Sequence, residues 1–101
     1  MTLPVVVALE AERQAGAIDR LWRMNRSAAP GLFRDELAAA LEFISLAPFA
    51  GRHYQRSKTP GVQRVLLRST RYHVYYVVRD PDALVVAAWS AVRGAGPDLR
   101  S

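Results

Sequence analysis

The first half of the chain combines a short apolar run with a longer stretch of helical periodicity. Leu3–Val7 is apolar enough to predict a β-strand, and Pro4 favours a sheet edge because proline cannot donate a ladder hydrogen bond. Over Glu10–Asn25 the apolar residues return every three or four positions, which places them on one face of a helix. The residues on this face are Ala11, Ala15, Ile18 and Trp22.

A second helical stretch follows a break at residues 25–27. Ser27 is a suitable N-cap and Pro30 is tolerated in a first turn, so this helix is expected to begin there. It is expected to run to about Leu46, before Pro48. Its apolar stripe consists of Phe33, Leu37, Ala40, Leu41 and Ile44. The short connection predicts an antiparallel helical hairpin.

After a predicted loop at residues 50–61, the pattern changes from helical to extended. Val62–Arg68, Arg71–Arg79 and Ala83–Val92 are rich in Val, Tyr and Leu, which favours β-strands. The connections between them have the length of hairpin turns, so a three-stranded antiparallel meander is predicted. The whole order indicates an α+β fold made of an N-terminal strand, a helical hairpin and this meander. We expect one domain over residues 1–101, with residues 94–101 as a flexible tail.

The middle strand assigns its side chains to two faces of the sheet, because successive residues point in opposite directions. The face expected to pack on the helices holds Tyr72, Val74, Tyr76 and Val78. The other face holds Arg71, His73, Tyr75, Val77 and Arg79. We expect this second face to be open, basic and aromatic.

Positive charge is concentrated in the second half of the chain. The net charge is +5, with a balance of −1 over residues 1–51 and +6 over residues 52–101. All the basic residues except Lys58 are arginines, whose guanidinium groups bind phosphate and carboxylate groups with two hydrogen bonds. The second half therefore suits an anionic partner; the competing interpretation of any single arginine is that it serves only solubility.

Composition removes several classes of site. There is no cysteine, which excludes disulfides, cysteine-ligated zinc and thiol catalysis. No run approaches the roughly 20 apolar residues of a membrane helix, and the N-terminus lacks a secretory leader, so a cytoplasmic protein is expected. His53 and His73 have no acidic cluster near them, so we expect no metal, and the absence of a Gly-rich phosphate loop leaves no expected cofactor.

Three stretches carry a pattern beyond this periodicity. The first is Ala47–Arg52, with the sequence Ala-Pro-Phe-Ala-Gly-Arg. The second is Val62–Arg68, which is followed by Arg-Tyr-His-Val-Tyr-Tyr at residues 71–76. The third is Val85–Gly94, which contains Trp89. Together they resemble the RelE/ParE toxin superfamily. They are similar to its Pro-x-x-Gly-Arg helix exit, its Arg-x-Leu … Tyr-x-x-x-Tyr strand pair and the strand that ends its sheet. They cover nearly the whole chain in the family's order, and residues 71–76 are closer to the ParE branch.

The resemblance implies a function and partners. It implies the toxin of a type II toxin–antitoxin module, neutralised by a cognate ParD-like antitoxin. ParE-like members poison DNA gyrase, whereas RelE-like members cut messenger RNA in the ribosome. An inactive homologue that only binds its antitoxin is a third alternative.

For a ribonuclease, the resemblance implies that Arg68, Arg71, His73 and Arg93 hold the RNA backbone and stabilise developing charge. The C-terminal acid/base pair of such nucleases is missing, because no tyrosine follows Tyr76 and no histidine follows His73. The alternative interpretation of His73 is an ordinary strand histidine beside tyrosines. No catalytic residue is therefore assigned with preference, and inhibition of gyrase by binding is favoured.

For a gyrase inhibitor, the contact region is expected on the second sheet face and around the end of the last strand. Its target-binding residues are predicted to be Arg64, Arg71, His73, Tyr75, Trp89 and Arg93. The competing interpretation makes the tyrosines and Trp89 ordinary core residues with polar tips.

Overall fold

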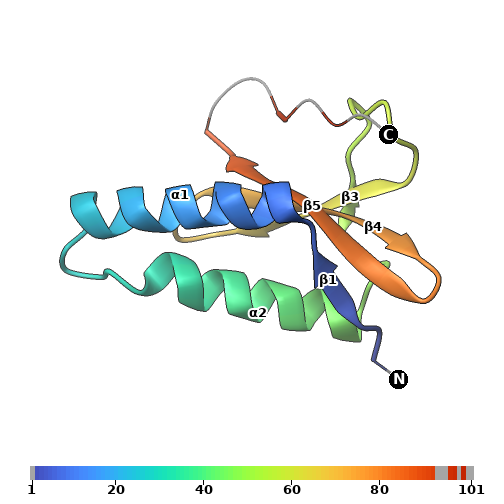
Figure 1. Ribbon diagram of the computed structural model, residues 1–101, viewed down its shortest axis with the longest axis horizontal. Helices are drawn as coiled ribbons and strands as arrows, with labels where there is room; N and C mark the ends of the chain where they lie inside the picture. Colours follow the sequence, from blue (N-terminus) through green and yellow to red (C-terminus); the bar gives the residue numbers. More distant parts are fainter. Residues whose placement is uncertain (1, 93–95, 98, 100–101) are drawn as a thin grey trace.

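Two helices lie side by side over one face of a five-stranded sheet (Figure 1). The computed structural model describes residues 2–92, 96, 97 and 99. The elements are β1 (Val5–Val7), α1 (Leu9–Asn25), α2 (Leu32–Leu46), β2 (Arg52–His53), β3 (Val62–Leu67), β4 (Tyr72–Arg79) and β5 (Asp82–Ser90).

The sheet has the strand order β1-β5-β4-β3-β2. Strands β3, β4 and β5 form the predicted antiparallel meander, and β1 is an edge strand as Pro4 indicates. Two features were not predicted. β1 pairs with β5 in parallel, and the expected loop at residues 50–61 contains β2, which pairs with Gln63 and Arg64 of β3.

The main core lies between the helices and the sheet. Phe33 and Ile44 of α2 are fully buried against Val74 and Tyr76 of β4 and their neighbours. The rings of Phe33 and Tyr72 meet edge to face, with centroids 5.4 Å apart. The apolar stripes predicted for both helices all contribute to this core, and the helix-facing side of β4 is as expected.

The second helix begins later than predicted. It starts at Leu32 with Gly31 as its N-cap, so the assignment of Ser27 as N-cap is wrong. The indole nitrogen of Trp22 donates a hydrogen bond to the carbonyl oxygen of Ala29 at 2.8 Å. Because a residue before proline avoids helical backbone angles, Ala29 and Pro30 belong to the turn between the helices.

A β-bulge at Val86 assigns the residues of β5 to the two faces. Tyr75 pairs with Ala87, but Tyr76 pairs with Val85, which leaves Val86 as the extra residue. Val85 therefore enters the core beneath the helices, while Ala87, only two residues away, packs on the opposite face.

The helix exit that resembles the family motif is held by Tyr76. The hydroxyl group of Tyr76 donates a hydrogen bond to the Pro48 carbonyl at 2.8 Å and accepts one from the Gly51 amide at 3.2 Å. The Gly51 carbonyl accepts a further bond from the Gln63 side chain at 3.0 Å. A Cβ atom at Gly51 would overlap the Tyr76 hydroxyl and lie 3.0 Å from two of its ring carbons, so only glycine fits here.

This contact makes Gly51→Ala a destabilising substitution despite its small size. We expect it to lower the free energy of unfolding by about 1–3 kcal/mol, as overpacking usually does. The double variant with Tyr76→Phe should be more stable than the sum of the two single changes predicts, because phenylalanine lacks the overlapping oxygen. Urea denaturation of the four proteins measures this coupling, and strict additivity would contradict it.

Two carboxylates connect separate elements. Asp19 of α1, which is buried, accepts hydrogen bonds from Arg23 and from Arg34 of α2, each at 3.1 Å. Glu36 accepts bonds from the Ser69 and Thr70 amides, each at 2.9 Å, and so holds the β3–β4 turn against α2. Burial by itself raises the pKa of both carboxyl groups, but these hydrogen bonds outweigh it, and both pKa values lie below their usual range.

A depressed carboxyl pKa gives a defined pH dependence of stability. Asp19 and Glu36 bind a proton more readily in the unfolded chain, where their pKa values are about 4, than in the folded one. Their contribution is therefore complete above about pH 5 and is lost as the pH falls through the lower folded-state values. Urea denaturation at several pH values should show this loss. The free energy of unfolding should depend less steeply on pH in Asp19→Asn and in Glu36→Gln. An unchanged pH dependence in both variants would contradict the assignment.

Candidate functional site

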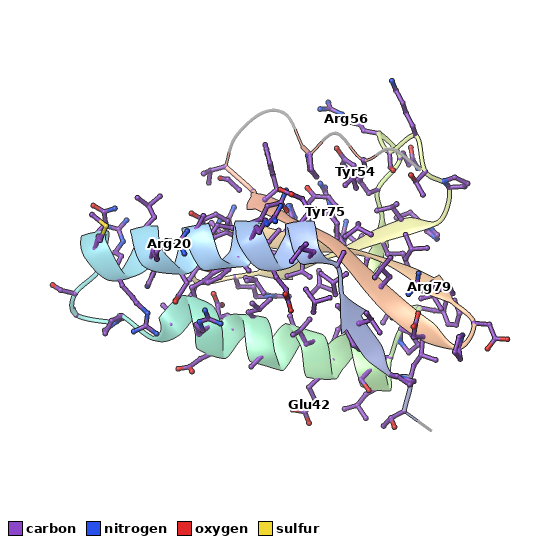
Figure 2. All side chains as sticks on the ribbon, viewed as in Figure 1. Arg20, Glu42, Tyr54, Arg56, Tyr75 and Arg79 are labelled. Carbon is purple, nitrogen blue, oxygen red and sulfur yellow. The ribbon has the colours of Figure 1, made fainter. Side chains whose placement is uncertain are left out.

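A cleft of about 490 Å³ lies on the sheet face away from the helices. Arg64 of β3 and His73 and Tyr75 of β4 line its floor, and residues 53–56, which include Tyr54 and Arg56, line one wall. In Figure 2, Tyr54, Arg56 and Tyr75 gather on the upper side of the view, whereas Arg20 and Glu42 lie on the helices.

Strand register brings the floor residues together. Arg64 pairs with Tyr75 across β3 and β4, and His73 pairs with Trp89 across β4 and β5. Directly opposite residues in a sheet project to the same face, so all four side chains share the side away from the helices. The sequence could assign faces within one strand, but the register between strands decides which residues become neighbours.

This face is not open along its length, which corrects the expectation for Tyr75. Tyr75 is only 1% exposed, because Tyr54 covers it with ring centroids 4.8 Å apart and an edge-to-face geometry. Val62, Ala87 and Leu99 also belong to this second apolar cluster. The loop after β2 thus folds back over the sheet, and Tyr75 forms part of the cleft floor rather than an exposed contact.

Arg64 is held in place by aromatic groups. Its guanidinium carbon lies 5.5 Å from the centre of the Tyr54 ring, a cation–π distance, and the guanidinium is close enough to the Tyr75 hydroxyl to act on the pKa of that group. Burial raises the pKa of that hydroxyl, so it stays protonated. Within the described part of the chain, the ion pairs involve Arg13, Arg23, Arg34 and Arg79, and Arg64 has no carboxylate partner there.

His73 is uncharged at neutral pH. Its partial burial, together with the positive charges of Arg64 and Arg71, lowers its pKa below the ordinary value of 6.5. Its ring lies 5.9 Å from that of Tyr75. A neutral imidazole carries one donor and one acceptor nitrogen, so His73 can bind a polar group in the cleft without adding charge.

A second hollow, of about 580 Å³, continues around the free edge of β3. It shares Arg64 and His73 with the cleft and adds Arg52, Arg68 and the apolar side chains of Phe43 and Leu66. Phe43 is 42% exposed and Leu66 is 37% exposed. We call this hollow the β3-edge groove. It is a mixed apolar and basic surface.

The remaining predicted residues are distributed around these two hollows. Arg71 lies in the β3–β4 turn with a positive φ of 65°, close enough for its charge to act on His73. Trp89 is 36% exposed on the cleft side, which disfavours a purely core role. Arg93 lies outside the described residues, as do most of residues 94–101, for which a tail was expected; of these Pro97 is buried.

Two cleft residues were missed by the sequence analysis, namely Tyr54 and Arg56. Both lie in a segment rich in Gly, Pro and polar residues, where no periodicity indicates which side chain turns inward. The available signal was a lone tyrosine among four basic residues over positions 52–58.

Among the described residues, no group of three or more His, Asp or Glu side chains could hold a metal ion. No described helix has the length and apolar character needed to cross a membrane.

Comparison with known proteins gives matches in three dimensions only. No protein-family model and no curated protein sequence matches the chain significantly. A chain of the chromosomal ParDE TA system from P. aeruginosa superposes with a TM-score of 0.72 at 12% identity, covering 88% of this chain and 96% of that one. The chain has the RelE/ParE fold.

A second solved structure supports this assignment. A chain of the intact E. coli RelBE toxin–antitoxin complex superposes with a TM-score of 0.59 at 21% identity, covering 92% of this chain and all of that one. The RelE/ParE fold expected from three short motifs is therefore confirmed, and of these two structures the ParDE chain has the higher TM-score.

Proposed function

We propose that this protein is the toxin of a type II toxin–antitoxin module and that, like ParE, it inhibits DNA gyrase by binding in the cytoplasm. The observation that carries the proposal is the fold, which is shared over almost its whole length with chains of ParDE and RelBE complexes. The basic cleft supplies the contact surface. As one domain, the chain would act without cofactor or metal.

The chemistry of the cleft favours binding over catalysis. Cleavage of a phosphodiester needs a base and an acid in addition to cations. The residues lining the described cleft include no carboxylate, and burial raises the pKa of Tyr75, which makes its hydroxyl a poor proton donor. Arg64 and His73, with Arg71 and Trp89 nearby, then contact the target.

A ribonuclease of the RelE type is the second candidate, and one observation favours it. His73 is neutral and lies close to Arg64 and Arg71, which is the state required of a general base next to a scissile phosphate. In that reaction Arg68, Arg71 and Arg93 would bind the RNA. The described lining of the cleft includes no carboxyl group that could serve as the complementary acid.

The antitoxin is proposed to bind the β3-edge groove. β2 pairs with only two residues of β3, Gln63 and Arg64, so the strand edge beyond them has no partner among the described residues. A second copy of this chain would bring Arg52 and Arg68 against their own counterparts, which disfavours self-pairing. A ParD-like segment with apolar and acidic residues would complement both the exposed Phe43 and these arginines.

The proposal is tested first in cells and then with purified gyrase. Expression without an antitoxin should stop growth, and the purified protein should inhibit supercoiling by gyrase and accumulate cleaved DNA. Arg64→Gln should lose most of the inhibition, whereas Arg20→Gln, an exposed arginine on α1, should retain it.

The alternative outcomes identify the other functions. Growth arrest with no effect on gyrase, but with cleavage of mRNA on translating ribosomes, would replace gyrase inhibition by the RelE-type activity. Normal growth at high expression of folded protein would indicate an inactive homologue.

A further inference from the structure

The β3–β4 turn, residues 68–71, is bound by a carboxylate of α2. Glu36 accepts hydrogen bonds from the Ser69 amide on Oε2 and from the Thr70 amide on Oε1, each at 2.9 Å. The Thr70 hydroxyl donates a third bond to Oε1 at 2.7 Å. Burial raises the pKa of the Glu36 carboxyl group, but these bonds outweigh it, so the group is ionised at neutral pH. Hydrogen bonds to an ionised acceptor are stronger than those between neutral groups, so the turn is firmly anchored to the helix.

Arg71, the last residue of this turn, has a strained backbone conformation. Its φ of 65° lies in the left-handed region, where the Cβ atom of any residue except glycine crowds a carbonyl oxygen. Its amide donates to the Leu67 carbonyl at 2.8 Å, and its carbonyl accepts from the Ala91 amide at 2.9 Å. Such conformations persist only where the surroundings fix them, and they are concentrated at functional sites. Glycine would adopt this backbone without the cost, so the strain points to a use for the arginine side chain.

The place of the turn in the fold indicates that use. The bond between Arg71 and Ala91 joins the turn to the end of β5, and Ala91 lines the cleft on the sheet face. The charge of Arg71 also acts on His73 in the cleft floor. No described carboxylate forms an ion pair with Arg71, and Glu36 binds the backbone amides of the turn instead. Arg71 is therefore an uncompensated cation at the end of the cleft, and the turn fixes its place.

We infer that Glu36 is a positioning residue for target binding: through the Ser69 and Thr70 amides it holds the turn in the conformation that places Arg71 at the end of the cleft. Glu36 does not contact the target itself. The inference rests on the proposed function, since it assumes that Arg71 contacts the target. It gives α2 a role in toxicity that is separate from its role in the hydrophobic core.

The structural part of the inference is tested on the purified protein without any target. Hydrogen exchange followed by NMR measures the opening of the Thr70 and Arg71 amides. Glu36→Gln leaves one acceptor oxygen in place of two, so both amides should exchange at least fivefold faster. Glu42→Gln, the same substitution at an exposed position of α2 (Figure 2), should change both rates less than twofold. Asp19→Asn, which removes a buried carboxylate that does not contact the turn, should also change them less than twofold.

The functional part is tested by a double-mutant cycle on growth arrest in cells without antitoxin, which does not presuppose gyrase as the target. Glu36→Gln and Arg71→Ala should each raise the amount of soluble protein needed to halve the growth rate at least fivefold. The double variant should match Arg71→Ala to within twofold, because Glu36 acts only through that arginine. A purely structural role would instead make the two losses multiply. Glu42→Gln and Asp19→Asn should retain toxicity per amount of soluble protein.

Arg71→Gly covers the case in which the Glu36 variant does not fold. Glycine adopts the left-handed conformation without the steric cost, so the urea midpoint should rise above that of the parent protein. Toxicity should fall as it does in Arg71→Ala. A lower urea midpoint, or full toxicity, would contradict the use of the strained arginine and overturn the inference.

The remaining outcomes separate this inference from the proposed function. Unchanged exchange at Thr70 and Arg71 in Glu36→Gln, or losses of toxicity that multiply in the double variant, would overturn the inference even if the parent protein inhibits gyrase. The expected cycle with no effect on supercoiling would keep the inference and remove gyrase as the target. Normal growth with the parent protein would remove both, because Arg71 would then have no target to contact.

Discussion

Tyr75→Ala should lower the free energy of unfolding by about 3–5 kcal/mol, as the loss of a buried aromatic ring usually does. Tyr75 is 1% exposed and packs against Tyr54 and the neighbouring apolar residues Val62 and Ala87. Few domains have more than about 5–15 kcal/mol of total stability, so the variant should be partly unfolded at physiological temperature. Urea denaturation followed by far-ultraviolet circular dichroism measures the change.

Tyr75→Phe is the matched control. It keeps the ring contact with Tyr54 and removes only the hydroxyl group near Arg64, so it should cost no more than about 1.5 kcal/mol. A loss below about 1 kcal/mol for Tyr75→Ala would mean that this side of the sheet is not a packed core.

Phe33→Ala should cost a similar amount, about 3–5 kcal/mol, from the opposite side of the sheet. Phe33 is fully buried between α2 and the sheet, and its ring meets that of Tyr72 edge to face at 5.4 Å. The cavity would lie directly behind the start of β4, where Tyr72 precedes His73. Thermal and urea unfolding should both report the loss.

Phe43→Ala provides the comparison within the same helix. Phe43 is 42% exposed and borders the β3-edge groove, so its removal should cost far less stability than the removal of Phe33. It should instead weaken binding of an antitoxin at that groove. Equal destabilisation by the two substitutions would show that Phe43 belongs to the core and would argue against the groove as a docking surface.

Local periodicity was sufficient for most of the fold. The three-to-four spacing of Ala11, Ala15, Ile18 and Trp22 defined α1 and its inward face, and the alternation from Tyr72 to Val78 assigned the helix-facing side of β4. These predictions succeed because a helix or strand exposes its period directly in the order of apolar residues. The meander followed because short connections between strands admit few arrangements.

The start of α2 and the β-bulge in β5 could not be predicted from the sequence pattern. The N-cap of α2 is Gly31 rather than Ser27, because Ala29 and Pro30 belong to the turn, where Trp22 of α1 donates a hydrogen bond to the Ala29 carbonyl. The bulge at Val86 lies in a run of four small apolar residues that carries no alternation, so nothing local indicates where the faces exchange. Both features depend on contacts with residues of another helix or strand.

The candidate site shows the same division. The basic second half, the position of His73 and Tyr75 on one face and the absence of a nuclease acid/base pair after Tyr76 are all properties of the sequence alone. Only the tertiary structure decided that Arg64 meets Tyr75, that Tyr54 and Arg56 join them, and that Tyr75 is buried rather than open. The physical reason is that strand register and loop path are set by the packing of the whole domain, whereas periodicity reports only the face on which each residue lies.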